Sequence, residues 1–373
     1  MDALMLPLNW QRVRLGDIGK PCMCKRVMKH QTTRYGEIPF YKIGTFGNTA
    51  DAFISKKLFL EYKTKYSFPK KGDILISASG TIGRAVIYDG KPAYFQDSNI
   101  VWIDNDETLV KNDFLFYAYS NVKWNTEHTT ILRLYNDNFR NTLIPLPPLN
   151  EQSAIANILS GLDRYLCALD ALILKKEGVK KALSFELLSQ RKRLKGFNQA
   201  WQRVRLGDIA NYLTSNLSVE QITQQGKIKV YDVNNFIGYT DTTFISDKPY
   251  ISIVKDGSVG RVRILPPKTN ILSTMGALIA NHRTTTEFLF YLLSNFDFKN
   301  FISGSIIPHI YFKDYKEKTI FLPPLNEQSA IANILSDLDN EIASLKNKKR
   351  QFENIKKALN HDLMSAKIRV LEK

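Results

Sequence analysis

The chain of 373 residues has few cysteines and no long apolar run. Its three cysteines, Cys22, Cys24 and Cys167, are an odd number, and a lone C-x-C falls far short of a zinc ligand set. They predict reduced thiols and a cytoplasmic protein. The N-terminal segment lacks the features of a signal peptide, and no stretch approaches the roughly 18 apolar residues of a membrane span, so we expect no membrane partner.

Motifs for catalysis are also missing. The glycine patterns at Gly44–Gly47 and Ser79–Gly83 lack the spacing and the lysine of a phosphate loop, and no glycine fingerprint for S-adenosylmethionine is visible. The five histidines have no metal-ligand spacing, and the scattered carboxylates form no nuclease pattern. The sequence therefore predicts a protein with no enzymatic activity, cofactor, metal or small-molecule substrate of its own. A self-contained methyltransferase is disfavoured on the same grounds.

Acidic residues are in deficit. The chain has 36 Asp and Glu against 52 Lys and Arg, for a formal net charge of +16. Such an excess favours an anionic partner, with nucleic acid ahead of a membrane surface. A generally basic proteome is the alternative explanation.

What the chain does have is an internal repeat. LPPLNEQSAIANILS occurs at Leu146–Ser160 and again at Leu322–Ser336, and WQRVRLGDI occurs at Trp10–Ile18 and Trp201–Ile209. The stretches between these copies share only short related runs, such as SGTIGRAVI with DGSVGRVRI and FLFYAYSN with FLFYLLSN. The pattern predicts one mixed α+β globule used twice with different surface residues.

A heptad-like pattern follows each Pro-Pro step. Leucines and isoleucines recur in steps of four and three after Ile155 and again after Ile331, which is the seam of a left-handed coiled coil. Asn150 is a good N-cap for the first helix and Gly196 a plausible end. Four lysines interrupt the seam, and their stems can cover apolar surface; they are Lys176, Lys180, Lys349 and Lys356.

The order of the repeats predicts that the two helices pair antiparallel. The sequence after the first helix also opens the chain, so the end of the second helix should lie near the start of the first. We expect an α+β fold with two mixed α/β globules, separated by a long antiparallel two-helix coiled-coil spacer and related by a pseudo-two-fold from internal duplication. The predicted globules are 1–148 and 196–324, and the predicted helical segments are 149–195 and 325–373.

The identical helix starts are candidates for docking a protein partner. Two copies of one surface predict two copies of one partner, whereas packing alone after a recent duplication is the alternative. The candidate docking residues are Leu149, Asn150, Glu151, Gln152, Ile155, Leu325, Asn326, Glu327, Gln328 and Ile331.

Polar loop residues of the globules are candidates for contacts with double-stranded DNA. Basic side chains would lie on phosphates, and Arg, Asn, Gln, Ser and Thr would read base edges. In the first globule the candidates are Lys29, His30, Arg34, Arg84, Arg133, Asn136 and Arg140. In the second they are Ser215, Asn216, Arg261, Arg263, His282, Arg283, His309 and Tyr311.

This frame resembles the specificity subunit of type I restriction–modification systems. The resemblance is carried by W-x-x-V-x-L-G-D-I at the start of each globule and by L-P-P-L-N-E-Q before each heptad helix, and it covers essentially the whole chain. It implies two target recognition domains, each reading half of an asymmetric bipartite DNA site. It also implies helices that set the gap and dock two methyltransferase subunits, and through them restriction subunits. The alternative is a coiled-coil scaffold with no role in nucleic-acid binding.

Overall fold

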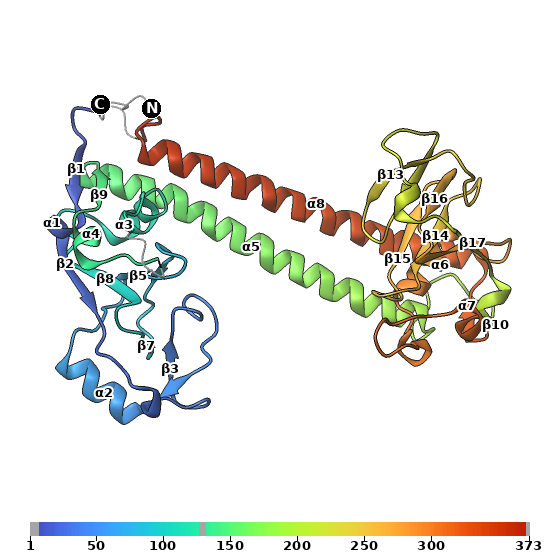
Figure 1. The fold of residues 1–373 in the computed structure, drawn as a ribbon, viewed down its shortest axis with the longest axis horizontal. Helices are drawn as coiled ribbons and strands as arrows, with labels where there is room; N and C mark the ends of the chain where they lie inside the picture. The colour runs from blue at the N-terminus through green and yellow to red at the C-terminus, as the bar shows by residue number, and fades with distance from the viewer. Residues whose placement is uncertain (1–6, 127–131, 371–373) are drawn as a thin grey trace. The chain divides into compact units, whose positions relative to one another are not determined.

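The computed structural model describes residues 7–126 and 132–370. They fall into two compact units (Figure 1). Unit 1 comprises residues 1–169 and 348–373, and unit 2 comprises residues 170–347. Each unit contains one globule together with a part of each long helix, α5 (Leu149–Leu188) and α8 (Leu325–Met364).

The globule of unit 1 is mixed α/β, as predicted. Its strands form a pair β1-β9, a four-stranded sheet β2-β8-β5-β6 and a three-stranded sheet β4-β3-β7. The strands are β1 (Gln11–Arg14), β2 (Gly19–Met23), β3 (Ile38–Tyr41), β4 (Phe53–Ile54), β5 (Ile74–Ser77), β6 (Ala85–Ile87), β7 (Tyr94–Phe95), β8 (Ile100–Asn105) and β9 (Leu143–Leu146). The short helices are α1 (Leu15–Ile18), α2 (Lys56–Lys65), α3 (Asn112–Tyr119) and α4 (Asn136–Arg140).

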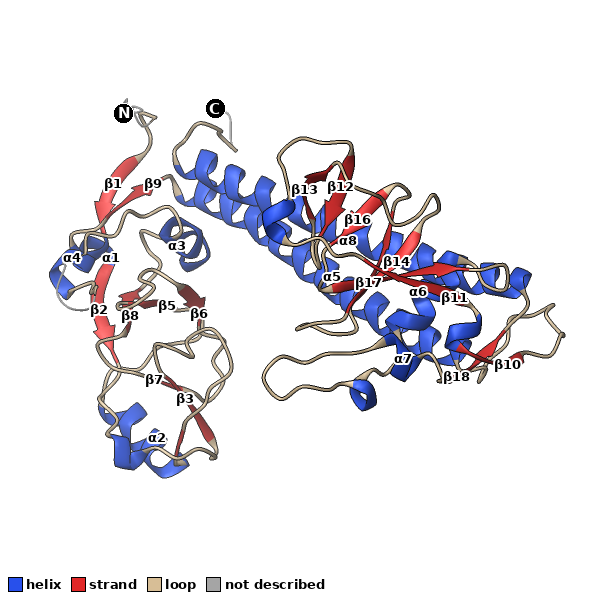
Figure 2. Ribbon diagram, turned by 45° about the vertical axis from the view of Figure 1, so that its right-hand side comes forward, coloured by secondary structure: helices blue, strands red, loops and turns tan. Residues whose placement is uncertain are grey.

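The globule of unit 2 repeats this topology. The pair β10-β18 and the sheets β11-β17-β14-β15 and β13-β12-β16 match those of unit 1 strand for strand (Figure 2). The strands are β10 (Gln202–Arg205), β11 (Ala210–Thr214), β12 (Ile228–Tyr231), β13 (Phe236–Thr240), β14 (Tyr250–Val254), β15 (Val262–Leu265), β16 (Thr269–Ile271), β17 (Met275–Ala280) and β18 (Thr319–Leu322). Helices α6 (Thr286–Ser294) and α7 (Phe312–Tyr315) correspond to α3 and α4. The prediction of one fold used twice is confirmed.

Burial explains why these strands and helices form. The central strands β5 and β14 carry only buried residues, typical of strands covered on both faces. The related runs FLFYAYSN and FLFYLLSN form most of α3 and α6, whose phenylalanines and leucines fill the core of each globule. Helix α2 lies in the longer variable segment of unit 1, and the described part of unit 2 has no helix between β13 and β14.

The two long helices run antiparallel within each unit, as the repeats predicted. In unit 1, Asp163 of α5 pairs with Lys356 of α8, and the rings of Tyr165 and Phe352 lie 4.7 Å apart. In unit 2, Lys176 and Lys180 of α5 pair with Glu341 and Asp339 of α8, respectively. Residue numbers therefore again rise along one helix while they fall along the other. Isoleucines and leucines of the heptad pattern are buried; they include Ile155, Leu159, Leu169, Ile173, Ile331, Leu335 and Ile342.

Two details of α5 differ from the prediction, namely the N-cap at Asn150 and the end at Gly196. The helix begins at Leu149, one residue before Asn150, and it ends at Leu188, well before Gly196. The physical reason is that Gln190 adopts the left-handed conformation, with φ 61°, and ends the helix before Gly196 is reached. Ala366 (φ 56°) occupies the equivalent position after the end of α8. Among the described residues, no helix is both long enough and apolar enough to cross a bilayer. The division into four successive domains stays a prediction.

Burial of the thiols makes a prediction about their reactivity. Cys24 lies in the core of unit 1, and burial raises the pKa of its thiol to about 12, whereas Cys167 on α5 is exposed. Because the thiolate is the reactive form, iodoacetamide at pH 8 should modify Cys167 first and Cys24 only after denaturation. Mass spectrometry of peptides at successive times measures both rates. Equal rates in the folded protein would contradict the buried position of Cys24.

Candidate nucleic-acid interface

A buried carboxylate joins three segments in each unit. In unit 1, Glu151 in the first turn of α5 accepts a hydrogen bond of 3.0 Å from Trp10 Nε1 and bonds of 2.7 and 2.9 Å from Arg369. Burying a charge costs free energy unless partners surround it, and here the tryptophan, the arginine and the positive helix end supply them. The first strand, the start of α5 and the segment after α8 are thereby held together.

Unit 2 contains the same arrangement. Glu327 of α8 accepts a bond of 3.0 Å from Trp201 Nε1 and bonds of 2.7 and 3.2 Å from Arg193. Both glutamates are almost completely buried. We call each set the Trp–Glu–Arg cluster.

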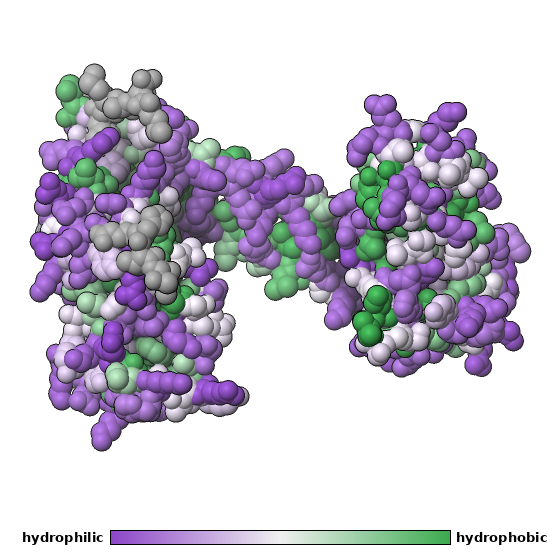
Figure 3. Space-filling model, viewed as in Figure 1, coloured by the Kyte–Doolittle hydropathy of each residue, from purple (hydrophilic) through white to green (hydrophobic). Residues whose placement is uncertain are grey.

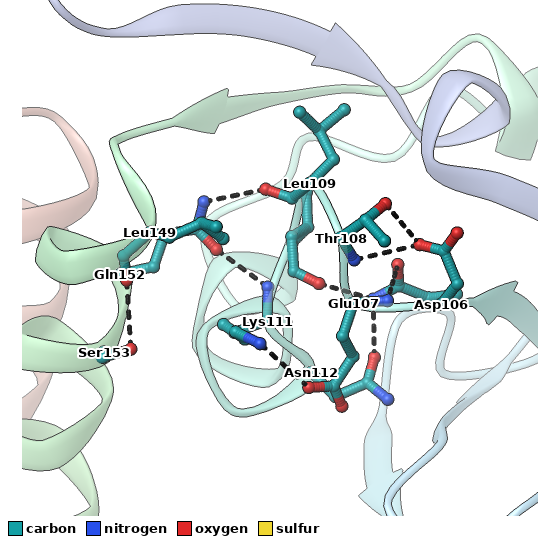
Figure 4. A network of polar contacts seen from close by, with 11 residues as sticks. Asp106, Glu107, Thr108, Leu109, Lys111, Asn112, Leu149, Gln152 and Ser153 are labelled. Carbon is teal, nitrogen blue, oxygen red and sulfur yellow. Dashed lines mark hydrogen bonds and ion pairs between the residues drawn. The ribbon is translucent and has the colours of Figure 1, made fainter.

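The next residue, a glutamine, ties the long helix to the globule. Gln152 donates to the carbonyls of Leu109 and Pro147 and accepts from the backbone N–H of Lys111, at 2.8 Å, just before α3 (Figure 4). In unit 2, Gln328 donates to the carbonyls of Pro323 and Arg283 and accepts from Thr284 and Thr285 just before α6. The glutamate and glutamine of the repeated N-E-Q motif therefore make equivalent internal contacts in both units.

A third pair of equivalent contacts joins both long helices to each globule. In unit 1, Tyr117 of α3 donates a 2.7 Å bond to Asp163, which also pairs with Lys356. In unit 2, Tyr291 of α6 donates a 2.9 Å bond to Asp339, whose second partner is Lys180. Burial, with the nearby carboxylate, raises the pKa of both tyrosines and keeps them as donors.

These contacts correct the interpretation of the lysines as mere interruptions of the seam. Lys180 and Lys356 are ion-pair partners of the opposite helix. The internal repeat contained the missed signal. Lys180 to Lys356, Asp163 to Asp339 and Arg193 to Arg369 are each separated by 176 positions, as are the LPPLNEQ copies (356 − 180, 339 − 163 and 369 − 193).

The predicted docking residues divide into buried and exposed sets. The side chains of Glu151, Gln152, Ile155, Glu327, Gln328 and Ile331 are buried and belong to the internal contacts, so they are not available to a partner. Leu149 is 42% exposed and Leu325 is 47% exposed, and Asn150 and Asn326 are exposed beside them. The same helix face continues through further exposed and identical residues, Ser153 and Asn157 in α5 and Ser329 and Asn333 in α8. We call these two surfaces the helix-start stripes.

In unit 1, two loops that carry predicted DNA contacts meet. Ser79 of the glycine-rich turn Ser79–Gly83 forms a backbone bridge with Arg133, whose side chain is exposed. The Ser79 hydroxyl donates a 2.8 Å bond to Asn99. A polar depression of about 450 Å³ is lined by residues that include Asn99, Arg133 and Lys29.

His30 and Arg34 lie with Lys29 on the same segment. Lys29 and His30 belong to the short 3-10 helix Lys29–Gln31, and Arg34 follows it. All three are exposed. The structure therefore brings Lys29 and Arg133 to one depression of unit 1.

In unit 2, the equivalent turn carries different chemistry. Asp256 of the turn Asp256–Gly260 forms the corresponding bridge with His309, and its carboxylate lies 2.6 Å from His309 Nδ1. The ring of Tyr311 stacks near that of His309, with centroids 6.4 Å apart. The aspartate favours the tautomer with a proton on Nδ1, which leaves Nε2 as the ring atom for an outside partner.

Two arginines follow this turn. Arg261 donates a 3.0 Å bond to the Asn234 side chain, and Arg263 donates a 2.6 Å bond to the Asn234 carbonyl. Arg263 also lies over the ring of Tyr231. Both guanidinium groups are thus held beside the loop between β12 and β13.

Several predicted DNA contacts have internal partners or lie elsewhere. Arg84 donates a 2.8 Å bond to the carbonyl of Phe46. Ser215 is buried and accepts from the N–H of Leu217, whereas its neighbour Asn216 is exposed. Because of these contacts, Arg84 has fewer free donors and Ser215 has less acceptor capacity for binding DNA.

Four further candidates make none of the contacts described above for the glycine-rich turns. Arg283 belongs to the contacts of Gln328, and His282 precedes it as an exposed residue. Asn136 and Arg140 are exposed on α4, where Arg140 packs beside Gly16 of α1. The structure therefore brings Arg133 together with Lys29 in one depression and His309 together with Tyr311 in a ring contact, and among the described residues it shows no such contact for these four.

Comparison with known proteins gives consistent matches. A family model described as "Type I restriction modification DNA specificity domain" matches residues 7–176 and 198–354. A putative type I restriction enzyme specificity subunit of Haemophilus influenzae is 64% identical over 148 residues, which are 39% of this chain and 38% of that protein. The type I restriction enzyme MjaVIII specificity subunit of Methanocaldococcus jannaschii is 25% identical over 414 residues, covering 99% and 95% of the two chains.

A solved structure shares the fold. The type I restriction–modification S subunit from M. genitalium superposes with a TM-score of 0.64 at 20% identity, covering 97% of this chain and 98% of that one. This match includes both globules and both long helices, because it spans nearly the whole of each chain.

The Trp–Glu–Arg clusters predict a stability effect. Glu151→Gln removes the charge that Arg369 and Trp10 surround, so the free energy of unfolding of unit 1 should fall by about 2 kcal/mol. Urea denaturation followed by tryptophan fluorescence measures the change. As a control, Glu61→Gln removes an exposed i,i+4 pair with Lys65 and should cost about 0.5 kcal/mol or less. Equal effects of the two substitutions would refute the role given to the cluster.

Proposed function

The chain belongs to the family of type I restriction–modification DNA specificity subunits, and from this premise we propose that its two globules read the two halves of one asymmetric, bipartite site in double-stranded DNA. One observation carries the proposal. The glycine-rich turn and the segment bridged to it carry Ser79 and Arg133 in unit 1 but Asp256 and His309 in unit 2. Arginine, histidine and aspartate present different donors and acceptors to base edges, so equivalent positions would select different bases.

Electrostatics support DNA as the ligand. The net charge of +16 provides for phosphate contacts, and exposed cations such as Lys29, Arg34 and Arg133 lie on the loops beside the turn of unit 1. Hydrophilic residues cover most of the face of each globule seen in Figure 3. The alternative, a scaffold without nucleic-acid binding, would leave this charge without a partner. The two functions differ in a salt titration, because DNA binding through phosphates should weaken with a log–log slope of several units.

We also propose that each helix-start stripe docks one modification subunit, so that two are bound. Packing accounts for the identity of the buried residues of LPPLNEQSAIANILS in the two copies, but it does not account for identity at the exposed positions. Leu149 and Leu325 offer an apolar anchor at the start of each stripe, with Asn150 and Asn326 beside them. In this proposal the modification subunits supply S-adenosylmethionine chemistry in the cytoplasm and recruit the restriction subunits. The paired helices set the number of unread base pairs between the half-sites.

The two half-sites should respond to different substitutions. Arg133→Ala should relax base preference in one half of the selected site and weaken binding about tenfold, because a base or phosphate contact is lost. His309→Ala should do the same in the other half only. Selection from randomised duplex DNA with each variant gives both sites, and Lys65→Ala on α2 is the exposed-cation control. If both variants altered the same half, the assignment of one globule to each half would be wrong.

The helix-start stripes should control partner stoichiometry. Leu149→Asp or Leu325→Asp alone should reduce bound modification subunits from two to one, and the double variant should bind none. The fold should tolerate both changes, since each leucine is half exposed and an acidic residue suits the first turn of a helix. Size-exclusion chromatography with light scattering on co-expressed complexes measures the ratio. Leu60→Asp, at an exposed position of α2, is the control, and an unchanged ratio in the double variant would reject these surfaces.

A further inference from the structure

A loop of unit 2 carries two isoleucines at its tip. Residues 304–308 connect Ser303 to His309, and the side chains of Ile306 and Ile307 are 92% and 54% exposed. Isolated exposed apolar residues are ordinary on protein surfaces, but two adjacent branched side chains at one loop tip form a small apolar wedge. The contacts in the described part of the globule leave this wedge uncovered.

The loop is held rigidly at its base. Ser303 and His309 exchange two backbone hydrogen bonds, of 2.9 and 2.7 Å, which close a tight hairpin. Gly304 has φ 88°, and a Cβ there would lie 2.3 Å from the carbonyl oxygen of Ile307. Pro308 fixes its own φ, and its carbonyl accepts a 2.9 Å bond from the N–H of Gly257 in the glycine-rich turn. A wedge held in this way loses little conformational entropy when it inserts into a partner.

The wedge rises from the surface that carries the proposed DNA contacts. His309 at the base of the loop pairs with Asp256, and Tyr311 stacks near its ring. The apolar tip is therefore next to the polar groups assigned to base reading in unit 2. This continuity argues for the interior of a base stack as the occupant, ahead of an apolar groove on a protein.

We propose that Ile306 and Ile307 insert between two neighbouring base pairs of bound DNA, partly unstack them and kink the duplex. The proposal rests on the proposed function, since it requires unit 2 to bind DNA. Isoleucine is one of the side chains that act as wedges between base steps, and the wider contact of a bent duplex offsets the free energy needed to unstack a step. The cost is least at flexible TA and CA/TG steps. Unit 2 would therefore select a flexible step without a hydrogen bond to it.

The corresponding segment of unit 1 includes residues 127–131, which lie outside the described residues. The proposal accordingly concerns unit 2 alone.

The test uses the full chain and the DNA site obtained by selection. 2-Aminopurine is placed at successive positions of the half-site assigned to unit 2, and end-labelled duplexes report bending by energy transfer. The native protein should raise the fluorescence at one step and shorten the end-to-end distance. The double variant Ile306→Ser, Ile307→Ser should lose both signals and about tenfold in affinity, with an unchanged salt slope because no phosphate contact is removed.

Two further variants make the outcome decisive. Ile306→Phe keeps a wedge and should keep the fluorescence signal, whereas Leu174→Ser, at a 71% exposed position of α5, should change nothing. A double variant that binds and bends DNA like the native protein would overturn the proposal. So would a double variant that loses modification subunits while its DNA signals persist, since the loop would then be a protein contact. If the native protein bound no specific DNA at all, the proposed function itself would fail.

Discussion

A buried glutamate at the start of each long helix is the constraint on which the rest of the structure depends. An ion removed from water costs several kcal/mol unless its partners are in place, so each carboxylate requires both its tryptophan and its arginine. In unit 2, Arg193 and Trp201 come from one continuous stretch after α5. In unit 1, Arg369 lies after α8 and Trp10 near the N-terminus, and Arg369 also contacts Asn9, so the same cluster is completed by the two ends of the chain.

This frame allows the proposed reading surfaces to differ while the backbone beneath them is kept. Gly83 and Gly260 close the two glycine-rich turns with φ of 84° and 81°. A Cβ at these positions would lie 2.1 Å from the ring of Trp124 and 2.7 Å from that of Phe298. Glycine is thus required at both turns by the left-handed backbone and by an aromatic neighbour. Since the turn is fixed, the side chains beside it can be substituted without changing the fold, and in the proposed function such substitutions change the base preference.

The sequence predicted the large features and missed what depends on three-dimensional contacts. Exact repeats and a period of 3.5 were sufficient for two like globules and an antiparallel helix pair, because both follow from order along the chain. The ends of the helices were missed because Gln190 and Ala366, not glycines, adopt the left-handed conformation. The identity of the two N-E-Q motifs could not show whether these residues dock a partner or pack internally, since a sequence repeat does not show which face of a helix is buried. Likewise, the acceptor of Arg84 is a backbone carbonyl, which has no signature in the sequence.

Internal duplication reconciles two demands that a simple dimer could not meet. The two identical partners that we propose require identical surfaces, and the helix-start stripes repeat the same exposed residues in both units. The proposed asymmetric DNA site requires different surfaces, and the segments bridged to the turns bear Arg133 in one unit and His309 in the other. In a dimer of identical chains every substitution appears twice, so the two reading surfaces would remain equal and the site palindromic. Within a single duplicated chain, the helix starts can stay constant while each turn changes independently, so the two proposed reading surfaces can diverge.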